Sequence, residues 1–100
     1  MENTDSGMLS ITQVNESLDK CNDWGIEDNG KSIRRIFQLG GFREAINFIN
    51  KVAEVAEREE HYPDIRLHSP NLIEIKLTTQ KVDCLTQKDF DVAIMIDQLN

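Results

Sequence analysis

His61 is the side chain in this 100-residue sequence best suited to proton transfer, because imidazole changes its charge near neutral pH. It lies in the stretch EREEHYPDI, residues 57–65, where a charged helix is expected to stop shortly before Pro63. Such a histidine could act as a general acid or base. The pattern favours a simpler role without chemistry, in which the protonated ring interacts with the carbonyl groups at the helix C-terminus. The pattern alone leaves both interpretations open.

Carboxylates are the other candidate acid–base groups, and most have a structural explanation. Asp89 occupies the third position of a helix that Thr86 would cap, where a carboxylate closes a capping box and complements the positive helix end. His68 falls on the polar face of an expected strand, which favours a surface position. Four more acids share one helix and are expected to be solvated: Glu54, Glu57, Glu59 and Glu60.

The charge balance excludes several classes of partner. The net charge of −7 and the pI near 4.7 would repel nucleic-acid backbones and anionic membranes. No apolar run approaches the length of about 20 residues that a membrane span needs.

Cys21 and Cys84 have no companions at metal-ligand spacing, which indicates free thiols in a reducing cytosol. With an N-terminus unlike a targeting signal, the sequence predicts a cytoplasmic protein without nucleic-acid or membrane partners and without a metal site.

Periodicity and turn signals predict three helices and four strands in one domain over residues 8–100, after a disordered lead at residues 1–7. The helices are expected over residues 9–21, 41–60 and 85–99, and the strands over 24–28, 31–39, 64–68 and 71–79. The resulting order is α-β-β-α-β-β-α. Strands with one apolar face favour an α+β fold, in which a four-stranded antiparallel sheet carries three helices on one face.

Three local patterns set the expected boundaries. Ser10 and Gln13 form a capping-box pair at the first helix, whose apolar face would include Ile11. Asn29-Gly30 predicts the first hairpin turn, because both residues tolerate positive φ. The long helix carries an apolar stripe wider than a small domain needs, which predicts a homodimer or homotetramer. The stripe consists of Phe42, Ala45, Ile46, Phe48, Ile49, Val52, Ala53, Val55 and Ala56.

Three stretches together resemble pterin-4a-carbinolamine dehydratases: FREAINFINKVAEVAEREEHYPDI, IEIKLTT and LTQKDFDVA. The similarity runs from about Trp24 to Leu99, and its most specific features are Glu57 with His61, Pro63, and LTxxD at the last helix. The resemblance implies removal of water from a 4a-hydroxytetrahydropterin without a metal or organic cofactor. Such a reaction needs groups that take a proton from nitrogen and help hydroxide depart, which histidines can supply.

Carried over one residue at a time, the resemblance places the site where the long helix ends and the last helix begins. His61 and Asp89 match catalytic positions of the family. Five further residues would line a pterin pocket between these elements: Glu57, Tyr62, Pro63, Thr79 and Gln80. A pterin would then be the ligand, with no cofactor or metal bound beside it.

Two histidines of the family pattern are missing from this set. Tyr62 stands in one position and Gln80 in the other, while the family's aromatic position falls at Ser69 or Pro70. Glutamine cannot shuttle a proton, and a phenol with an ordinary pKa near 10 is a poor base. Losing one positioned acid or base typically lowers a rate by about 10²–10⁴-fold, although a neighbour such as His68 could compensate.

The thinned histidine set favours a non-catalytic family member as the first hypothesis. Some dehydratase-like proteins act as assembly factors for Rubisco, so Rubisco subunits are the leading client and carboxysomes a further location. The alternative is an active or slow 4a-hydroxytetrahydropterin dehydratase that uses His61 and Asp89. Transcriptional coactivation, known in the animal branch of the family, is a third and weaker hypothesis.

Overall fold

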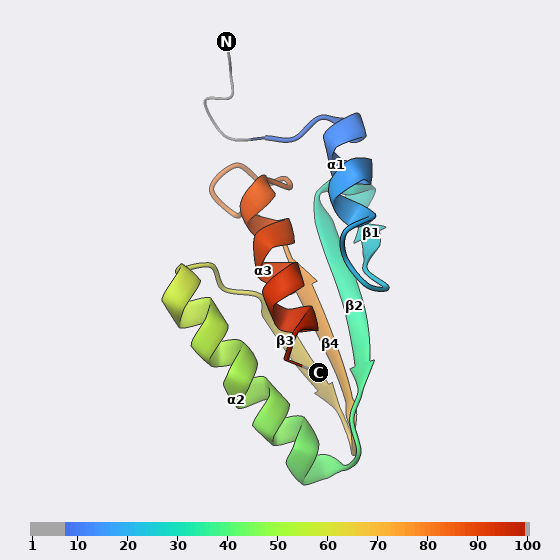
Figure 1. Ribbon diagram of the computed structural model, residues 1–100, viewed down its shortest axis with the longest axis vertical. Helices are drawn as coiled ribbons and strands as arrows, with labels where there is room; N and C mark the ends of the chain where they lie inside the picture. Colours follow the sequence, from blue (N-terminus) through green and yellow to red (C-terminus); the bar gives the residue numbers. More distant parts are fainter. Residues whose placement is uncertain (1–7, 100) are drawn as a thin grey trace.

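The computed structural model describes residues 8–99, and the expected disordered lead at residues 1–7 lies outside them. The elements follow the predicted α-β-β-α-β-β-α order, with a short 3₁₀ turn, η1, between the first two strands (Figure 1). The predicted α+β class is confirmed. The bounds are α1 Ile11–Leu18, β1 Gly25–Glu27, η1 Asp28–Gly30, β2 Ser32–Gln38, α2 Phe42–Glu59, β3 Asp64–His68, β4 Leu72–Leu77 and α3 Gln87–Asp97.

The sheet is antiparallel with strand order β1-β2-β4-β3, so β2 and β4 lie at its centre. Ile33 pairs with Leu77 and Phe37 pairs with Ile73, which brings the apolar side chains of both central strands to the same face. These four side chains are at most 1% exposed. The helices cover this face of the sheet, as predicted (Figure 1).

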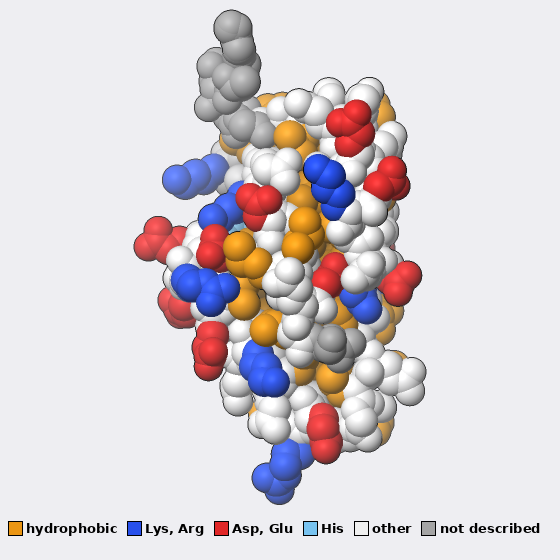
Figure 2. Space-filling view, viewed as in Figure 1, with side chains coloured by type: hydrophobic (Ala, Val, Ile, Leu, Met, Phe, Trp, Pro, Cys, Tyr) orange, Lys and Arg blue, Asp and Glu red, His pale blue; other side chains and the backbone are white. Residues whose placement is uncertain are grey.

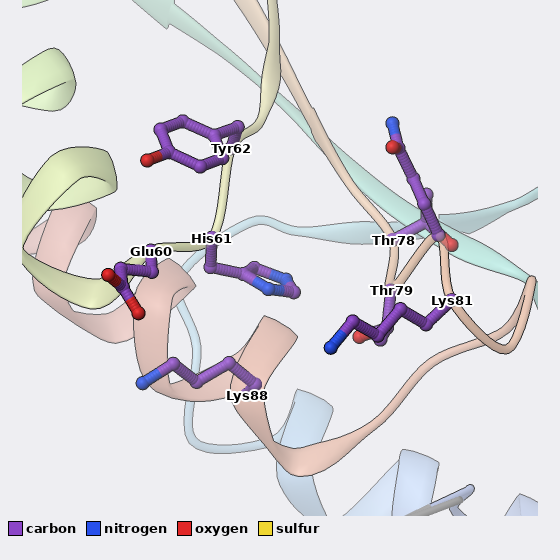
Figure 3. A pocket seen from close by; sticks show the side chains of 8 residues that line it. Glu60, His61, Tyr62, Thr78, Thr79, Lys81 and Lys88 are labelled. Atoms are coloured by element: carbon purple, nitrogen blue, oxygen red, sulfur yellow. The ribbon is translucent and has the colours of Figure 1, made fainter.

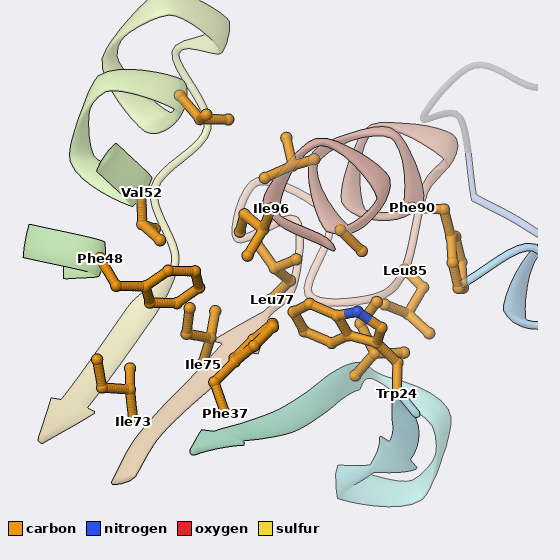
Figure 4. Packing of buried hydrophobic residues seen from close by; sticks show 14 of the residues in the cluster. Trp24, Phe37, Phe48, Val52, Ile73, Ile75, Leu77, Leu85, Phe90 and Ile96 are labelled. Carbon is orange, nitrogen blue, oxygen red and sulfur yellow. The ribbon is translucent and has the colours of Figure 1, made fainter. Parts of the chain in front are cut away.

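Helices α2 and α3 pack on the covered face through aliphatic and aromatic side chains (Figure 4). The ring of Phe37 lies 4.8 Å from that of Phe48 on α2 and 6.2 Å from that of Trp24. Tilted and edge-to-face contacts of this kind add to the hydrophobic gain from burying the rings. The core thereby sets the position of α2 relative to α3, and with it the gap between the end of one helix and the start of the other.

The Asn29-Gly30 turn occurs where the sequence predicts it, although the connection is longer than these two residues. Both residues have positive φ, 57° for Asn29 and 87° for Gly30. Glu27 pairs with Ser32, so residues 28–31 connect β1 to β2. The Ser32 hydroxyl donates a hydrogen bond to the Asp28 carboxylate at 2.7 Å, which ties the two ends of the turn together.

Helix α1 begins with the predicted capping box. The backbone N–H of Gln13 donates to the Ser10 hydroxyl at 3.1 Å, and that of Ser10 donates to the Gln13 side chain at 2.9 Å. Val14 belongs to the core. Ile11 was expected on the same buried face, but it is 81% exposed. It is the first residue of a short helix and lies beyond the end of the core.

Replacing Ser10 with alanine should lower the free energy of unfolding by about 1 kcal/mol, because the Gln13 N–H loses the hydroxyl oxygen that caps it. Thr12→Ala, at an exposed position of the same helix, is the control and should change stability by less than about 0.5 kcal/mol. Urea denaturation followed through Trp24 fluorescence measures both variants. Equal midpoints for the wild-type chain and Ser10→Ala would show that the cap contributes nothing to stability.

Helix α2 buries a narrower stripe than its sequence pattern predicts. Phe42 and Ile46 belong to the predicted stripe, yet they are 53% and 38% exposed, and Ala53 is exposed as well. Helix α2 contacts α3 on one side, and these apolar residues on its outward side stay partly or fully exposed. The buried residues of the helix are Ala45, Phe48, Val52, Val55 and Ala56.

Candidate active site

The long helix ends in a way that turns His61 back toward α3. Glu60 adopts the left-handed conformation with a φ of 52°, and the N–H of His61 donates to the carbonyl of Ala56 at 3.1 Å. Helices commonly close their C-termini with hydrogen bonds of this kind. Pro63 then restricts Tyr62 to extended conformations, which leads the chain into β3. The predicted helix end near Glu60 or His61 is confirmed.

Helix α3 begins with the predicted capping box, and this arrangement buries Asp89. The N–H of Thr86 donates to Asp89 Oδ2 at 3.0 Å, and the hydroxyl of Thr79 donates to the same oxygen at 2.8 Å. The hydroxyl oxygens of Thr79 and Thr86 lie 2.7 Å apart, so Thr86 donates to Thr79 in this arrangement. The Asp89 side chain is 0% exposed. Such a carboxylate is stable in the interior only when its oxygens accept hydrogen bonds, as they do here.

His61 meets the other oxygen of the same carboxylate. Its Nε2 lies 2.6 Å from Asp89 Oδ1, and only 11% of its side chain is exposed. Because a carboxylate only accepts hydrogen bonds, Nε2 carries the proton, and Nδ1 keeps the lone pair when the ring is neutral. Asp89 therefore sets the tautomer and orientation of His61. It also stabilises the imidazolium that forms when Nδ1 takes a proton.

His61 opens onto a pocket of about 300 Å³ between the end of α2, the segment after β4 and the start of α3 (Figure 3). This volume is at the lower end of the range for small-molecule sites and suits a compact ligand of one or two rings. The lining residues come from all three segments: Glu60, His61, Tyr62, Thr78, Thr79, Gln80, Lys81 and Lys88.

The structure brings the central residues of the expected site together. Tyr62, Thr79 and Gln80 lie in the pocket wall with His61. Asp89 is not in the wall, because it lies behind His61 and supports it from the protein interior. The residue that replaces the second missing family histidine, Gln80, is thus placed where it could touch a ligand.

Glu57 and Pro63 lie beside the pocket rather than in its wall. Glu57 accepts a hydrogen bond from the Tyr62 hydroxyl at 3.3 Å, and its negative charge raises the pKa of Tyr62. Tyr62 therefore stays protonated at neutral pH, and even less phenolate is available to act as a base than for an ordinary phenol. Pro63 acts through the backbone, by holding the chain after His61 extended.

Sequence reasoning missed two lysines of the pocket wall, Lys81 and Lys88. Each adjoins a residue that the family resemblance identifies, Gln80 in one case and Asp89 in the other. The Lys88 amino group donates to Glu59 at 2.8 Å, and this hydrogen bond holds the pKa of Glu59 below its ordinary value. Adjacency is the one signal that could have found them, because lysines in loops and first helical turns are otherwise ordinary surface residues.

Metal and thiol chemistry find no support in the part of the chain that the structure describes. Within residues 8–99, no three His, Cys, Asp or Glu side chains are placed to hold a metal ion. Over the same range, none of the helices has the length and apolarity needed to cross a membrane.

Burial raises the pKa of the Cys21 thiol to about 11 and also raises that of Cys84. Both thiols stay protonated at neutral pH and are poor nucleophiles.

Comparison with known proteins identifies the family. A family model described as pterin 4 alpha carbinolamine dehydratase matches residues 8–99. The chain belongs to this family. A relative from Picosynechococcus sp. is 43% identical over 91% of this chain and 96% of its own length. One from Nostoc sp. is 41% identical over 93% and 97%. Both bear the name "Putative pterin-4-alpha-carbinolamine dehydratase".

Two solved structures share the dehydratase fold. The crystal structure of a transcriptional coactivator/pterin dehydratase from Brucella melitensis matches with a TM-score of 0.85 at 25% identity, over 92% of this chain and 97% of that one. A pterin dehydratase-like protein identified as a RuBisCO assembly factor in the alpha-carboxysome matches with a TM-score of 0.66 at 16% identity, over 78% and 89%. At such low identity the second match shows the fold alone.

Proposed function

We propose that this chain is an active pterin-4a-carbinolamine dehydratase. In the sequence analysis this was the alternative to the first hypothesis, a non-catalytic assembly factor. The observation that carries the proposal is the His61–Asp89 contact of 2.6 Å at the wall of a pocket of about 300 Å³. A buried carboxylate that orients a histidine is a common way to prepare a general base. The relatives at 43% and 41% identity, which bear the dehydratase name, support the same proposal.

The chemistry requires one proton to leave nitrogen and one hydroxide to leave carbon. His61 Nδ1 accepts the proton of the ring nitrogen, and the electrons of that N–H bond form a C=N bond to the neighbouring carbon. The C–O bond of that carbon breaks, and its electron pair stays on oxygen. Asp89 stabilises the imidazolium as it forms. Because no electrons are gained or lost overall, the reaction requires no redox cofactor.

The test is the dehydration of chemically generated 4a-hydroxytetrahydropterin by the purified chain. His61→Ala should lower the rate above background by about 10²–10⁴-fold, because the positioned base is removed. His68→Ala is the matched control: its imidazole is 47% exposed, lies 3.5 Å from Glu74 and does not line the pocket. This variant should keep the wild-type rate. A wild-type chain without turnover, or a His61→Ala variant with the full rate, would refute the proposal.

A role in Rubisco assembly, the leading hypothesis from the sequence, has less support. The likeness to the assembly factor lies at 16% identity and carries only the fold. The replacement of two family histidines by Tyr62 and Gln80 is the observation that still favours this second function. Co-purification of Rubisco large subunits with the chain, combined with no dehydration, would favour the assembly role and with it a carboxysome location.

We also propose that the chain forms a homodimer or homotetramer through the exposed side of α2. Phe42 and Ile46 lie one turn apart on this helix and are 53% and 38% exposed. Figure 2 shows apolar side chains exposed between charged groups of both signs on the helix-bearing face. Burying such residues between copies would remove apolar surface from water.

Light scattering should accordingly give a mass that is a multiple of 11.5 kDa. Changing Phe42 and Ile46 together to aspartate should shift the mass toward a single chain, because the apolar surface would become charged. Ile11→Asp is the matched control, since Ile11 is 81% exposed but lies on α1. A wild-type mass of 11.5 kDa at all concentrations would contradict self-association, and an unchanged mass in the double variant would exclude this surface.

A further inference from the structure

Lys81 is a pocket cation that the mechanism described so far leaves without a role. It follows Gln80 in the segment after β4 and lies in the pocket wall with His61 and Thr79. Figure 3 shows its amino group directed toward the space beside the His61 ring. Lys81 forms no ion pair with any residue between 8 and 99, whereas Lys88, the other lysine of the wall, is held by Glu59 at 2.8 Å. The charge of Lys81 is therefore available to a ligand.

Dehydration has a second requirement that His61 does not meet. While His61 takes the proton from nitrogen, the departing hydroxide needs a proton to leave as water. Gln80 cannot supply it, because an amide does not give up a proton near neutral pH. Tyr62 directs its hydroxyl to Glu57 at 3.3 Å, and the nearby carboxylate raises its pKa and makes it a weaker acid. Among these wall residues, the ammonium group of a lysine suits the task better.

We propose that Lys81 is the general acid of this site, an inference that rests on the proposed dehydratase function. Its Nζ donates a proton to the hydroxyl oxygen as the C–O bond breaks, so the leaving group departs as water. An alkylammonium is a far stronger acid than water, so this transfer is energetically downhill. The positive charge also stabilises negative charge that develops on the oxygen. The step ends with a neutral amine and a protonated His61, and solvent exchange restores both.

Lys81 thereby takes over the role of the family histidine whose position Gln80 occupies. The two residues are adjacent in a segment that leaves β4 after Leu77, and both contribute to the pocket wall. A lysine side chain is long enough to reach the same space from the next position along the chain. The site then contains a complete pair, with His61 as base and Lys81 as acid, although it retains only one of the family's histidines.

The experiment compares Lys81→Ala, Lys81→Arg and the control Lys20→Ala in the dehydration assay. Lys20 is an exposed lysine in the segment after α1. We expect kcat to fall by at least about 10²-fold in Lys81→Ala and to stay unchanged in Lys20→Ala. Lys81→Arg should be nearly as slow as Lys81→Ala, because guanidinium keeps the charge but does not give up a proton. Added methylammonium should rescue Lys81→Ala and leave the wild-type rate unchanged, which a merely structural role would not produce.

Each outcome separates the inference from the function on which it rests. A wild-type chain without turnover would overturn both. Wild-type turnover with an equally fast Lys81→Ala would overturn the assignment of Lys81 alone. A fast Lys81→Arg would limit Lys81 to charge stabilisation and would overturn its role as acid, and so would a slow Lys81→Ala that methylammonium does not rescue.

Discussion

Replacing Asp89 with asparagine should slow dehydration by about 10²–10⁴-fold while the chain stays folded. The carboxylate accepts hydrogen bonds on both oxygens: Oδ2 from Thr86 N–H and the Thr79 hydroxyl, and Oδ1 from His61 Nε2. An asparagine has one oxygen and one NH₂ group. If its oxygen keeps the two buried donors satisfied, its NH₂ group faces Nε2 of His61. The proton of the neutral ring must then move to Nδ1, and the lone pair that should accept the substrate's proton is lost.

The matched control for this prediction is Asp91→Asn, on the same helix. Asp91 accepts a hydrogen bond from Gln87 at 3.0 Å near the surface, so the variant removes the same charge and leaves the His61–Asp89 hydrogen bond intact. Dehydration rates should separate the two variants. Nitrogen NMR of His61 should show the Nε2–H tautomer in the wild-type chain and the Nδ1–H tautomer in Asp89→Asn. An Asp89→Asn variant with the wild-type rate would show that catalysis does not depend on the His61 tautomer that Asp89 imposes.

Much of the fold could be predicted from the sequence because its decisive signals are local. The cap at Ser10 and the turn at Asn29-Gly30 each depend on residues within a few positions. The end of α2 before Pro63 follows in the same way from the steric limits of proline. Apolar periodicity identifies the face of a helix that packs inward, but it does not say where the core ends. Ile11 and Phe42 therefore matched the pattern and are nevertheless exposed.

The site depends on contacts that no local pattern contains. His61 and Asp89 are 28 positions apart, and they meet only because α2 and α3 pack on the same face of the sheet. The family resemblance identified both residues, but not the hydrogen bond between Thr79 and Asp89. The direction of Lys81 depends on the conformation of the segment between β4 and α3, which has no periodic pattern to predict it.

The ion pair between Arg35 and Asp97, at the other end of α3, could not be predicted from local sequence patterns either. Arg35 lies between Ile33 and Phe37 on the covered face of β2, where alternation alone would place an apolar residue. Its guanidinium stacks over the Phe37 ring, 4.1 Å from the centroid, and donates to Asp97 at 2.7 Å. Arginine suits this position because it is planar, weakly hydrated and able to stack on an aromatic face.

Asp97 is the acceptor on which this group depends, so Asp97→Ala should lower the free energy of unfolding by about 3–5 kcal/mol. Its carboxylate accepts hydrogen bonds from Trp24 Nε1 at 2.8 Å and from Asn22 N–H at 3.0 Å, in addition to Arg35. Only 6% of the Asp97 side chain and 15% of the Arg35 side chain are exposed. The buried Arg35 Nε already has no hydrogen-bond partner among the described residues. Removing the carboxylate would therefore leave a buried charge without compensation.

Urea denaturation followed by far-ultraviolet circular dichroism would measure this loss, against a typical total stability of about 5–15 kcal/mol. Glu27→Ala is the matched control, because it breaks the Arg34–Glu27 ion pair, whose side chains are 34% and 33% exposed. Such a pair is worth at most about 1 kcal/mol. The double variant Arg35→Met, Asp97→Leu should recover part of the loss, since it removes both charges but leaves Trp24 Nε1–H and Asn22 N–H without their acceptor. An Asp97→Ala variant no less stable than Glu27→Ala would show that Asp97 does not compensate the buried charge of Arg35.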